Sequence, residues 1–287
     1  MKLALGTAQF GLSYGIANKA GKVGQSEVAK VLTRARASGI DLLDTAIAYG
    51  DSETSLGSVG VDGFKVVTKL PVDIDSDIET WVAQHLRASL RRLRVDAVYG
   101  LLLHRSEQLL GPDGQALAKV LLKLKAEGLV SKIGVSIYDP EELDAVTRVC
   151  AIDLVQAPFN LFDQRLMASG WLPRLHNAGI EVHVRSVFLQ GLLLMPRHYV
   201  PEKFRPWSAL FDRWHSWLAD GHSTAAETCL AFANHPMIDR VVVGIDSLAQ
   251  FNEILQASAS PSVVELPDLT CNDTNLINPS NWSLLSG

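Results

Sequence analysis

Four side chains within the first 104 residues have the chemistry needed to move a proton. Asp44 and Tyr49 lie five positions apart, and Lys69 and His104 each directly follow an apolar run. A tyrosine, with a reference pKa near 10, is protonated at neutral pH and can act as a general acid. An ammonium held by a carboxylate favours the phenolate, and a neutral histidine can orient the oxygen that accepts the proton. The set therefore predicts proton transfer to a carbonyl oxygen.

Each of these residues also has an ordinary structural explanation when taken alone. Aspartate is common in caps and turns, which suits Asp44, and Tyr49 precedes Gly50 in an expected turn. Strand alternation leaves open whether Lys69 points inward or outward, and a lone histidine such as His104 is usually a satisfied core residue. The combination favours catalysis because four chemically linked residue types follow successive apolar runs.

Short apolar runs alternate with helical patterns along the chain. Most of the runs are continuously apolar, as in strands of a parallel sheet that is covered by helices. Eight alternations in about 260 residues favour one α/β domain, a closed (β/α)₈ TIM barrel over residues 1–260, rather than an open doubly wound sheet. The predicted strands are Leu3–Leu5, Leu42–Leu43, Lys65–Thr68, Val98–Leu103, Lys132–Val135, Leu154–Val155, Glu181–Val184 and Val241–Val243.

Helix start signals separate these runs. Serine, threonine and aspartate side chains accept hydrogen bonds from the first free N–H groups of a helix, and a glutamate three positions later completes a capping box. The predicted caps are Ser26, Ser76 with Glu79, Asp113, Asp139, Thr224 with Glu227, and Ser247.

Two segments do not follow the alternation. Residues 196–221 are predicted as a long loop between the last two strands, in which Phe211, Trp214 and Trp217 recur at helical spacing. That spacing favours the buried face of a surface helix, and a lid over a pocket is the alternative. Residues 261–287 are rich in Asn, Ser and Pro and have no clear helix or strand. We expect this tail to pack near the active-site mouth.

Composition narrows the partners. The net charge is −5 and no run of Lys and Arg is present, so nucleic acid is not expected as a partner. The three cysteines, Cys150, Cys229 and Cys271, are far apart and odd in number, which predicts neither a disulfide framework nor a metal site and favours a reducing cytoplasm. No signal peptide or membrane span is expected. A barrel of this size is compatible with a monomer or a small homo-oligomer.

Four segments resemble the aldo-keto reductase superfamily: DTAIAYGDSE at residues 44–53, VTK at 67–69, LLH at 102–104 and GVS at 134–136. The similarity runs from Gly6 to about Leu255 and points to a bacterial aldo/keto reductase. Members of this family are (β/α)₈ barrels that reduce carbonyls with a nicotinamide cofactor. The resemblance implies that Tyr49 is the general acid, that Lys69 and Asp44 tune it, and that His104 orients the carbonyl.

The resemblance also implies NADPH or NADH as cofactor. Ser136 and Gln156 match positions that hold the nicotinamide carboxamide, whereas Ile137 stands where the family has asparagine, so that contact is lost or comes from another group such as Asn160. Residues 186–191 resemble the loop that wraps the pyrophosphate. The implied cofactor-binding residues are Gly6, Thr7, Ser136, Gln156, Arg185, Ser186, Phe188, Gln190, Gly191, Gly244, Asp246, Ser247 and Gln250.

Two of these positions depart from the family pattern. Arg185 stands where the family stacks an aromatic ring on the nicotinamide; a guanidinium also stacks, but it adds positive charge and suits an anionic substrate group. Asp246 stands where the family commonly has Lys or Arg beside the adenosine 2′-phosphate, at a helix N-terminus that favours anions. A carboxylate repels a phosphate and accepts hydrogen bonds from a free ribose hydroxyl. NADPH and NADH therefore both stay open.

The leading function is NAD(P)H-dependent reduction of an aldehyde or ketone to an alcohol, or the reverse oxidation. Residues 184–191 are more similar to relatives associated with sugar and surface-polysaccharide pathways, which suggests a sugar-type carbonyl as the small-molecule substrate. A Schiff-base lyase that uses the Lys69 amine and a catalytically silent, nicotinamide-nucleotide-binding regulatory protein are the alternatives. The expected pocket walls are residues 9–14, 105–111 and 196–221 and the tail through Trp282.

Overall fold

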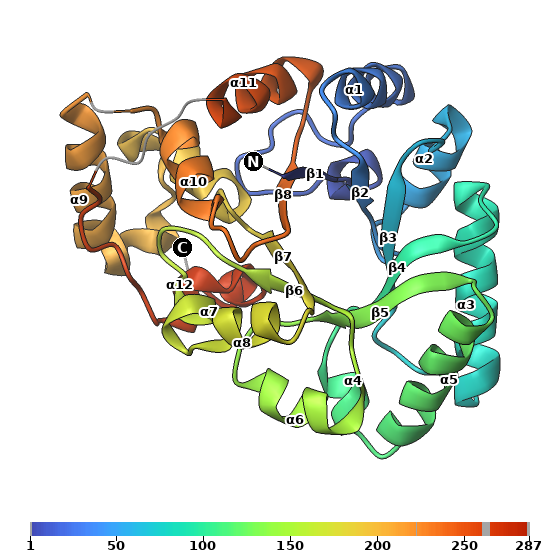
Figure 1. Cartoon of the computed structure of the whole chain (residues 1–287). Coiled ribbons are helices and arrows are strands. Elements are labelled where there is room, and N and C mark those ends of the chain that lie inside the picture. Colours follow the sequence, from blue (N-terminus) through green and yellow to red (C-terminus); the bar gives the residue numbers. More distant parts are fainter. Residues whose placement is uncertain (1, 222, 260–264, 286–287) are drawn as a thin grey trace.

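Eight parallel strands close into a barrel in the order of the sequence, with β8 paired to β1 (Figure 1). The computed structural model describes residues 2–221, 223–259 and 265–285. All eight predicted strands are present, and the predicted (β/α)₈ TIM barrel is confirmed. The strands are β1 (Leu3–Gly6), β2 (Leu42–Asp44), β3 (Lys65–Leu70), β4 (Val98–Leu103), β5 (Val130–Ser136), β6 (Leu154–Pro158), β7 (Glu181–Arg185) and β8 (Arg240–Gly244).

Strand alternation explains how polar groups reach one end of the barrel. An apolar cluster gathers one residue from each of six strands: Ala4, Leu42, Val67, Leu102, Leu154 and Val242. Because side chains two positions apart share a face, the residues two positions later also face this way. Those residues are Gly6, Asp44, Lys69, His104, Gln156 and Gly244. The interior of the barrel is therefore apolar at mid-height and polar at the carboxyl ends of the strands.

Helices surround the strands and share a larger apolar core with their outer faces (Figure 1). The helices are α1 (Gln25–Ala37), α2 (Ser52–Val59), α3 (Ile78–Leu93), α4 (Glu107–Leu110), α5 (Gly114–Ala126), α6 (Glu142–Val149), α7 (Arg165–Ala168), α8 (Trp171–Asn177), α9 (Ser208–Ala219), α10 (Ala225–Ala233), α11 (Leu248–Ser258) and α12 (Thr274–Ile277). Short 3₁₀ helices cover Ala8–Phe10, Leu189–Leu194, Arg197–Tyr199, Glu202–Trp207 and Pro279–Leu284.

The predicted caps are confirmed at two helices. Thr224 and Glu227 form both halves of a capping box at α10. The side chain of Ser247 accepts a hydrogen bond from the Gln250 N–H at α11. Asp113 stands at the N-cap of α5, although its side chain makes no capping hydrogen bond.

Three other cap predictions are wrong by one to two residues. α1 begins after Gly24, whose backbone is extended, so Ser26 already lies in the first turn. α3 is capped by Asp77 rather than Ser76, because Asp77 is the extended residue whose carboxylate accepts from the Thr80 N–H. α6 has Glu141 at its N-cap position, and Asp139 lies in the turn before it.

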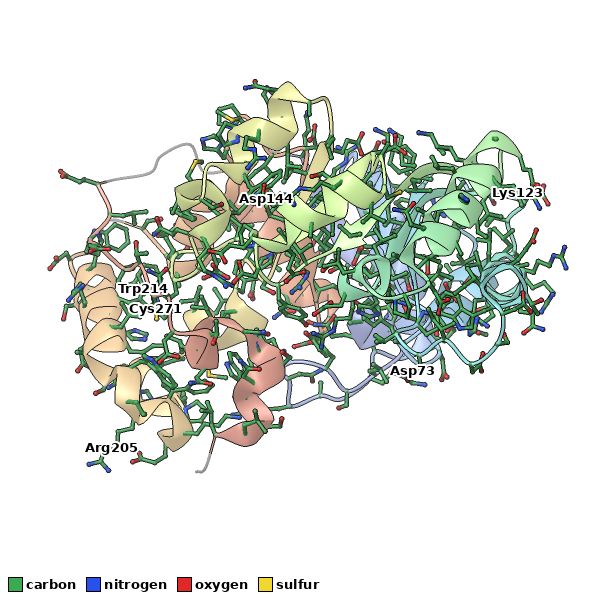
Figure 2. All side chains as sticks on the ribbon, turned by 90° about the horizontal axis from the view of Figure 1, so that it is seen from below. Asp73, Lys123, Asp144, Arg205, Trp214 and Cys271 are labelled. Carbon is green, nitrogen blue, oxygen red and sulfur yellow. The ribbon has the colours of Figure 1, made fainter. Side chains whose placement is uncertain are left out.

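Residues 196–221 form helices, so the predicted long loop is wrong. Two 3₁₀ turns lead into α9, which buries Phe211 and Trp214 completely. The Trp214 Nε1–H donates to the carbonyl oxygen of Leu193 at 3.1 Å, and the ring stacks on Trp217 with centroids 5.7 Å apart. Figure 2 shows Trp214 on the inner side of α9, whereas Arg205 projects outward. The interpretation of this pattern as one buried face of a helix is confirmed.

The described part of the tail, residues 265–285, contains α12 and a 3₁₀ helix, so the expectation of no helix there is wrong. Some of the polar residues that made this segment look irregular in the sequence cap these two helices. The Asp273 and Asn278 side chains accept hydrogen bonds from Asn275 N and Ser280 N. Trp282 packs edge-on against Phe204 at 4.9 Å between centroids. The domain boundary predicted at residues 260 and 261 lies outside the described residues. Placement of the tail near the active-site mouth stays a prediction.

Candidate active site

A buried ion pair between Asp44 and Lys69 lies at the carboxyl ends of β2 and β3. The Lys69 Nζ donates to both Asp44 carboxylate oxygens at 2.8 Å and to the Thr45 carbonyl oxygen at 2.9 Å. These three contacts use the three N–H groups of the ammonium. Burial lowers the pKa of Lys69 in spite of the opposing effect of Asp44. The alternation of side chains along β3 thus points Lys69 into the barrel, where the Asp44 carboxylate holds its ammonium group.

Tyr49 lies over this pair. The Lys69 Nζ is 5.1 Å from the centre of the Tyr49 ring, and the His104 ring meets the Tyr49 ring edge-on at 5.8 Å between centroids. Burial, and then the charge of Asp44, raise the pKa of Tyr49 above its ordinary value. That the ammonium favours the phenolate stays a prediction: its N–H groups donate to Asp44 and Thr45, and the net effect of the surroundings is a raised pKa of Tyr49. Tyr49 therefore keeps its proton throughout the neutral range.

The turn that carries Tyr49 is held by the segment after β1. A side chain on Gly11 would place its Cβ 1.8 Å from the Tyr49 carbonyl oxygen, so only glycine allows this approach. Gly50 has a φ of +54°, which also favours glycine. The N–H and the hydroxyl of Thr7 both donate to the Asp44 carbonyl oxygen at 2.9 Å. Backbone contacts between two strand ends thus position the phenol and the carboxylate together.

Glu53, the last residue of the 44–53 segment, has a structural part. Its buried carboxylate accepts from the Thr68 hydroxyl at 2.6 Å and pairs with Arg92 at 2.7 Å. These contacts tie α2 to β3 and α3. The motif therefore combines residues that face the pocket with one that anchors the helix behind it.

His104 is held in its neutral form. Burial, followed by the charges of Lys69 and Arg185, lowers its pKa to about 4. The ring then has one N–H donor and one acceptor nitrogen at neutral pH. Its Nδ1 is buried without a hydrogen-bond partner. The ring can therefore donate a hydrogen bond to a group that enters the site.

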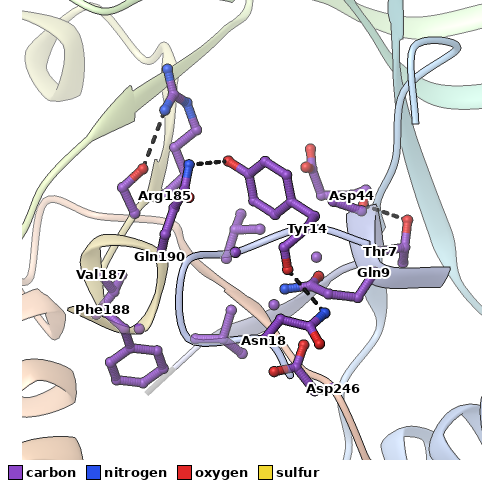
Figure 3. A pocket seen from close by; sticks show the side chains of 18 of the residues that line it. Thr7, Gln9, Tyr14, Asn18, Asp44, Arg185, Val187, Phe188, Gln190 and Asp246 are labelled. Carbon is purple, nitrogen blue, oxygen red and sulfur yellow. Dashed lines mark hydrogen bonds between the residues drawn. The ribbon is translucent and has the colours of Figure 1, made fainter. Parts of the chain in front are cut away.

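One pocket extends from this cluster to the N-terminus of α11 (Figure 3). It is lined by all of the sequence-predicted site residues except Lys69, which lies behind Asp44 and Tyr49, and Ser247, which caps α11. Four buried polar atoms without a partner belong to lining residues: Gln9 Oε1, His104 Nδ1, Gln156 Oε1 and Asp246 Oδ1. Buried polar atoms are normally paired, so these atoms indicate a polar ligand along the whole pocket.

The loop after β7 has unusual backbone geometry. Ser186, Leu189 and Gln190 have φ values of 60°, 47° and 54°, and Gly191 follows at 87°. Non-glycine residues rarely adopt such angles, and they persist mainly at binding sites. A side chain on Gly191 would place its Cβ 2.5 Å from that of Ala17, so this loop closes tightly over the segment after β1. The loop and the unpaired atoms together fit a nicotinamide dinucleotide.

The structure assigns different contacts to two residues expected at the nicotinamide carboxamide. The Gln156 Nε2 donates to Asp44 Oδ2 at 2.7 Å, which leaves its Oε1 facing the pocket. Asn160 does not replace the missing asparagine, because its Oδ1 accepts from the N–H groups of Phe162 and Asp163. Its Nδ2 donates to the Ser186 carbonyl oxygen at 3.0 Å.

Arg185 is anchored at the tetrad end of the pocket. It donates to the Ile137 carbonyl oxygen at 3.0 Å and to the Ser186 hydroxyl at 3.2 Å. Its guanidinium carbon lies 4.4 Å from the centre of the Tyr138 ring. Tyr138 was not predicted as a site residue, although it lies two residues after β5, where site residues are expected.

Tyr14 also lines the pocket and accepts a hydrogen bond from Gln190 at 3.1 Å, so the expected wall at residues 9–14 is present.

The other expected walls are absent from this pocket. Its lining includes no residue from 105–111 or 196–221, nor any described residue of the tail, Trp282 among them. Residues 196–221 and the tail pack on one another, and the tail reaches the loop after β6, where the Cys271 N–H donates to the Phe162 carbonyl oxygen at 2.8 Å. The segments at β1, β5 and β7 form the walls instead.

Two searches confined to the described residues gave no further site. No group of three or more His, Cys, Asp or Glu side chains there is arranged to hold a metal ion. No helix within those ranges is long and apolar enough to cross a membrane.

Comparisons with known proteins agree with this geometry. Aldo-keto reductase YhdN of Bacillus subtilis is 28% identical over 168 residues, which is 54% of this chain and 50% of YhdN. An aldo-keto reductase of Mycolicibacterium smegmatis is 30% identical over 136 residues, 44% of this chain and 45% of that protein. The chain thus spans about half the length of the curated relatives it matches.

Solved structures share the fold over most of the chain. The holo form of aldo-keto reductase AKR11C1 from Bacillus halodurans has a TM-score of 0.73 at 19% identity, covering 92% of this chain and 88% of that one. Glycerol dehydrogenase AKR11B4 from Gluconobacter oxydans has a TM-score of 0.71 at 22% identity, with the same coverage of 92% and 88%. The family model described as the aldo/keto reductase family matches residues 2–265. Aldo-keto reductases use NADPH or NADH, and this chain belongs to the aldo/keto reductase family.

Proposed function

We propose that this protein is an NAD(P)H-dependent oxidoreductase that reduces an aldehyde or ketone to an alcohol, with Tyr49 as the general acid. The observation that carries the proposal is that a protonated Tyr49 and a neutral His104 share a pocket with unpaired polar atoms. A bound NAD(P)H supplies the hydride. The chain supplies the proton and the orientation of the carbonyl.

Each residue of the tetrad has a distinct part. The Tyr49 hydroxyl donates its proton to the carbonyl oxygen, and the His104 ring donates a hydrogen bond that orients the same oxygen. The ammonium of Lys69, 5.1 Å from the centre of the Tyr49 ring, offsets the charge of the phenolate after the proton has left. Asp44 holds that ammonium in place through two 2.8 Å contacts.

We further propose a small sugar-type carbonyl as substrate and the cytoplasm as compartment. Arg185 lines the pocket at the tetrad end and suits a carboxylate or phosphate group on such a substrate. The tyrosine side chains of Tyr14 and Tyr138 beside it offer hydroxyl groups to a polyhydroxylated molecule. The three free cysteines support a reducing compartment.

The Schiff-base alternative is disfavoured by the surroundings of Lys69. Its amine is fully buried, does not line the pocket and donates three hydrogen bonds. An amine that attacks a carbonyl must be neutral and accessible. Borohydride in the presence of the carbonyl substrate should therefore leave no covalent adduct on Lys69.

The test is the Tyr49→Phe variant with a panel of sugars and small aldehydes, using NADH and NADPH. We expect kcat to fall by about 10³-fold because the acid is removed. Cofactor binding, followed by tryptophan fluorescence, should be unchanged. Unchanged turnover in the variant would refute Tyr49 as the acid. Wild-type protein that binds the cofactor but reduces nothing on the panel would favour the regulatory alternative.

A further inference from the structure

We infer that this chain selects NADH over NADPH, because the carboxylate of Asp246 lines the end of the pocket opposite Arg185 and that of Glu27 accepts a hydrogen bond from the Leu248 N–H at the start of α11. The inference rests on the proposed function, since it concerns the cofactor of that reaction. It assigns a specificity-determining part to Glu27, a residue of α1 that lies outside the motifs.

The two ends of the pocket carry opposite charge. Figure 3 shows Arg185 and Asp246 at opposite ends, with Gln9 between them. Among the lining residues, Arg185 is the one lysine or arginine. A ring that delivers hydride to a carbonyl at Tyr49 must lie at the Arg185 end. The remainder of a dinucleotide then extends toward Gly244, Asp246 and Gln250.

Two of the first three N–H groups of α11 are already engaged by the protein. The Leu248 N–H donates to Glu27 Oε1 at 2.8 Å, although 221 positions separate the two residues. The Gln250 N–H donates to the Ser247 hydroxyl at 3.1 Å, and the Asp246 N–H donates to Gln250 Oε1 at 2.7 Å. A helix N-terminus binds phosphate through free N–H groups and its dipole. Here a carboxylate already occupies that position.

The positive charges near Glu27 do not offset the repulsion between its carboxylate and a phosphate. The hydrogen bond from Leu248 holds the pKa of Glu27 below its ordinary value, so its carboxylate is charged at neutral pH. Lys30 lies one turn later on α1 and is paired with Glu27 at 3.5 Å. Arg34 donates to the Asn252 side chain at 2.8 Å. The nearby cations therefore have partners within the protein.

Asp246 distinguishes the two ribose forms more directly. Its Oδ1 is buried and lacks a hydrogen-bond partner, and the residue lines the pocket. A ribose with free hydroxyls can donate to this oxygen. A 2′-phosphate has no proton to donate when it is fully ionised, and it is repelled by the carboxylate. The same atom thus attracts the NADH ribose and repels the NADPH ribose.

The test measures the dissociation constants of NADH and NADPH by titration calorimetry, on the full chain at low salt. We expect NADH to bind at least about tenfold more tightly than NADPH. The ratio of the two dissociation constants should approach one as NaCl screens the repulsion between the carboxylates and the 2′-phosphate. The double variant Glu27→Gln, Asp246→Asn should bind NADPH at least about tenfold more tightly than wild type does, because both charges are removed. The glutamine of E27Q retains an oxygen for the Leu248 N–H, so the helix contact persists.

Glu253→Gln is the matched control. It removes one charge from the exposed surface of the same helix, and the NADH to NADPH ratio should stay at the wild-type value. NADPH binding as tightly as NADH, or more tightly, in the wild-type protein would overturn the inference while leaving the proposed function intact. Binding of neither nucleotide would overturn both. An NADPH affinity that the double variant leaves unchanged would remove the part assigned to the two carboxylates.

Discussion

Each end of the barrel holds a tyrosine, a lysine, a histidine and a carboxylate. At the carboxyl ends of the strands these are Tyr49, Lys69, His104 and Asp44. Near the amino ends they are Tyr99, Lys132, His183 and Glu181. The two sets contain the same chemical groups in different arrangements.

In the amino-end set, the carboxylate contacts the tyrosine and the lysine and lies near the histidine. The Tyr99 hydroxyl donates to Glu181 Oε1 at 2.7 Å, the Lys132 Nζ lies 2.9 Å from the same oxygen, and a His183 ring nitrogen lies 3.4 Å from Oε2. Burial alone would raise the pKa of Glu181, but its contacts with His183, Tyr99 and Lys132 hold it below its ordinary range. The tyrosine proton here is committed to a neighbouring side chain.

At the carboxyl end, the side chains that donate to the Asp44 carboxylate, among the described residues, are those of Lys69 and Gln156. Tyr49 and His104 are left facing a pocket, and His104 Nδ1 has no partner. The comparison teaches that residue types do not define a catalytic site. The proposed site is the cluster whose phenol and imidazole remain available to a ligand.

Removing one hydroxyl at each end gives the largest expected contrast. Tyr49→Phe should lower kcat by about 10³-fold, whereas Tyr99→Phe should leave kcat within about twofold of wild type. Tyr99→Phe should instead lower the free energy of unfolding by about 1.5–3 kcal/mol, because it removes a hydrogen bond to a charged group. Turnover with a saturating substrate and urea denaturation measure the two effects. A similar loss of kcat in both variants would contradict the distinction between the two ends.

The sequence alone distinguishes the two ends by position along each strand. The tetrad residues close or follow their apolar runs, whereas Tyr99, Lys132 and Glu181 lie at or near the start of theirs. Because function in such barrels concentrates at the carboxyl ends, that ordering predicts the four residues that the structure brings together at the pocket. The barrel itself could be predicted because most of the eight strands form continuous apolar runs in the sequence.

Contacts between distant segments could not be predicted. Nothing in the local pattern shows that Gln156 donates to Asp44, since 112 positions separate them. The contact between Glu27 and Leu248 depends on how α1 packs beside α11. The cap predictions were wrong at α1 and α3 because neighbouring residues have similar N-cap propensities. The backbone angles of the preceding turn decide which of them becomes the cap.

Replacing Lys69 should lower the free energy of unfolding more than replacing Lys132. Lys69→Met leaves Asp44 buried without its counter-charge, which we expect to cost about 3–5 kcal/mol of unfolding free energy and most of the activity. Lys132→Met leaves Glu181 with Tyr99 and His183, in a partly exposed pair, and should cost about 1 kcal/mol. Thermal and urea denaturation give both values.

A double variant keeps this prediction testable if Lys69→Met does not fold. Asp44→Asn combined with Lys69→Met removes both buried charges and should recover at least about half of the lost stability, without recovering activity. Equal costs for Lys69→Met and Lys132→Met would show that the two pairs are energetically alike, against the comparison. Recovery of activity in the double variant would show that the ion pair is dispensable for the proposed proton transfer.

The smallest effect concerns pH and tests whether His104 stays neutral. Its pKa falls from 6.5 to about 4 in the folded chain, so the unfolded chain binds the extra proton between those values. The free energy of unfolding should therefore decline as pH falls from about 6.5 to about 4. Below that range this residue should cause no further change. After allowance for partial exposure at the pocket mouth, the decline is about 2 kcal/mol. His104→Asn cannot bind that proton, so its pH profile should be flatter by this amount. Parallel profiles would mean that His104 titrates normally and is charged near pH 6, where it could no longer act as a neutral donor beside Tyr49.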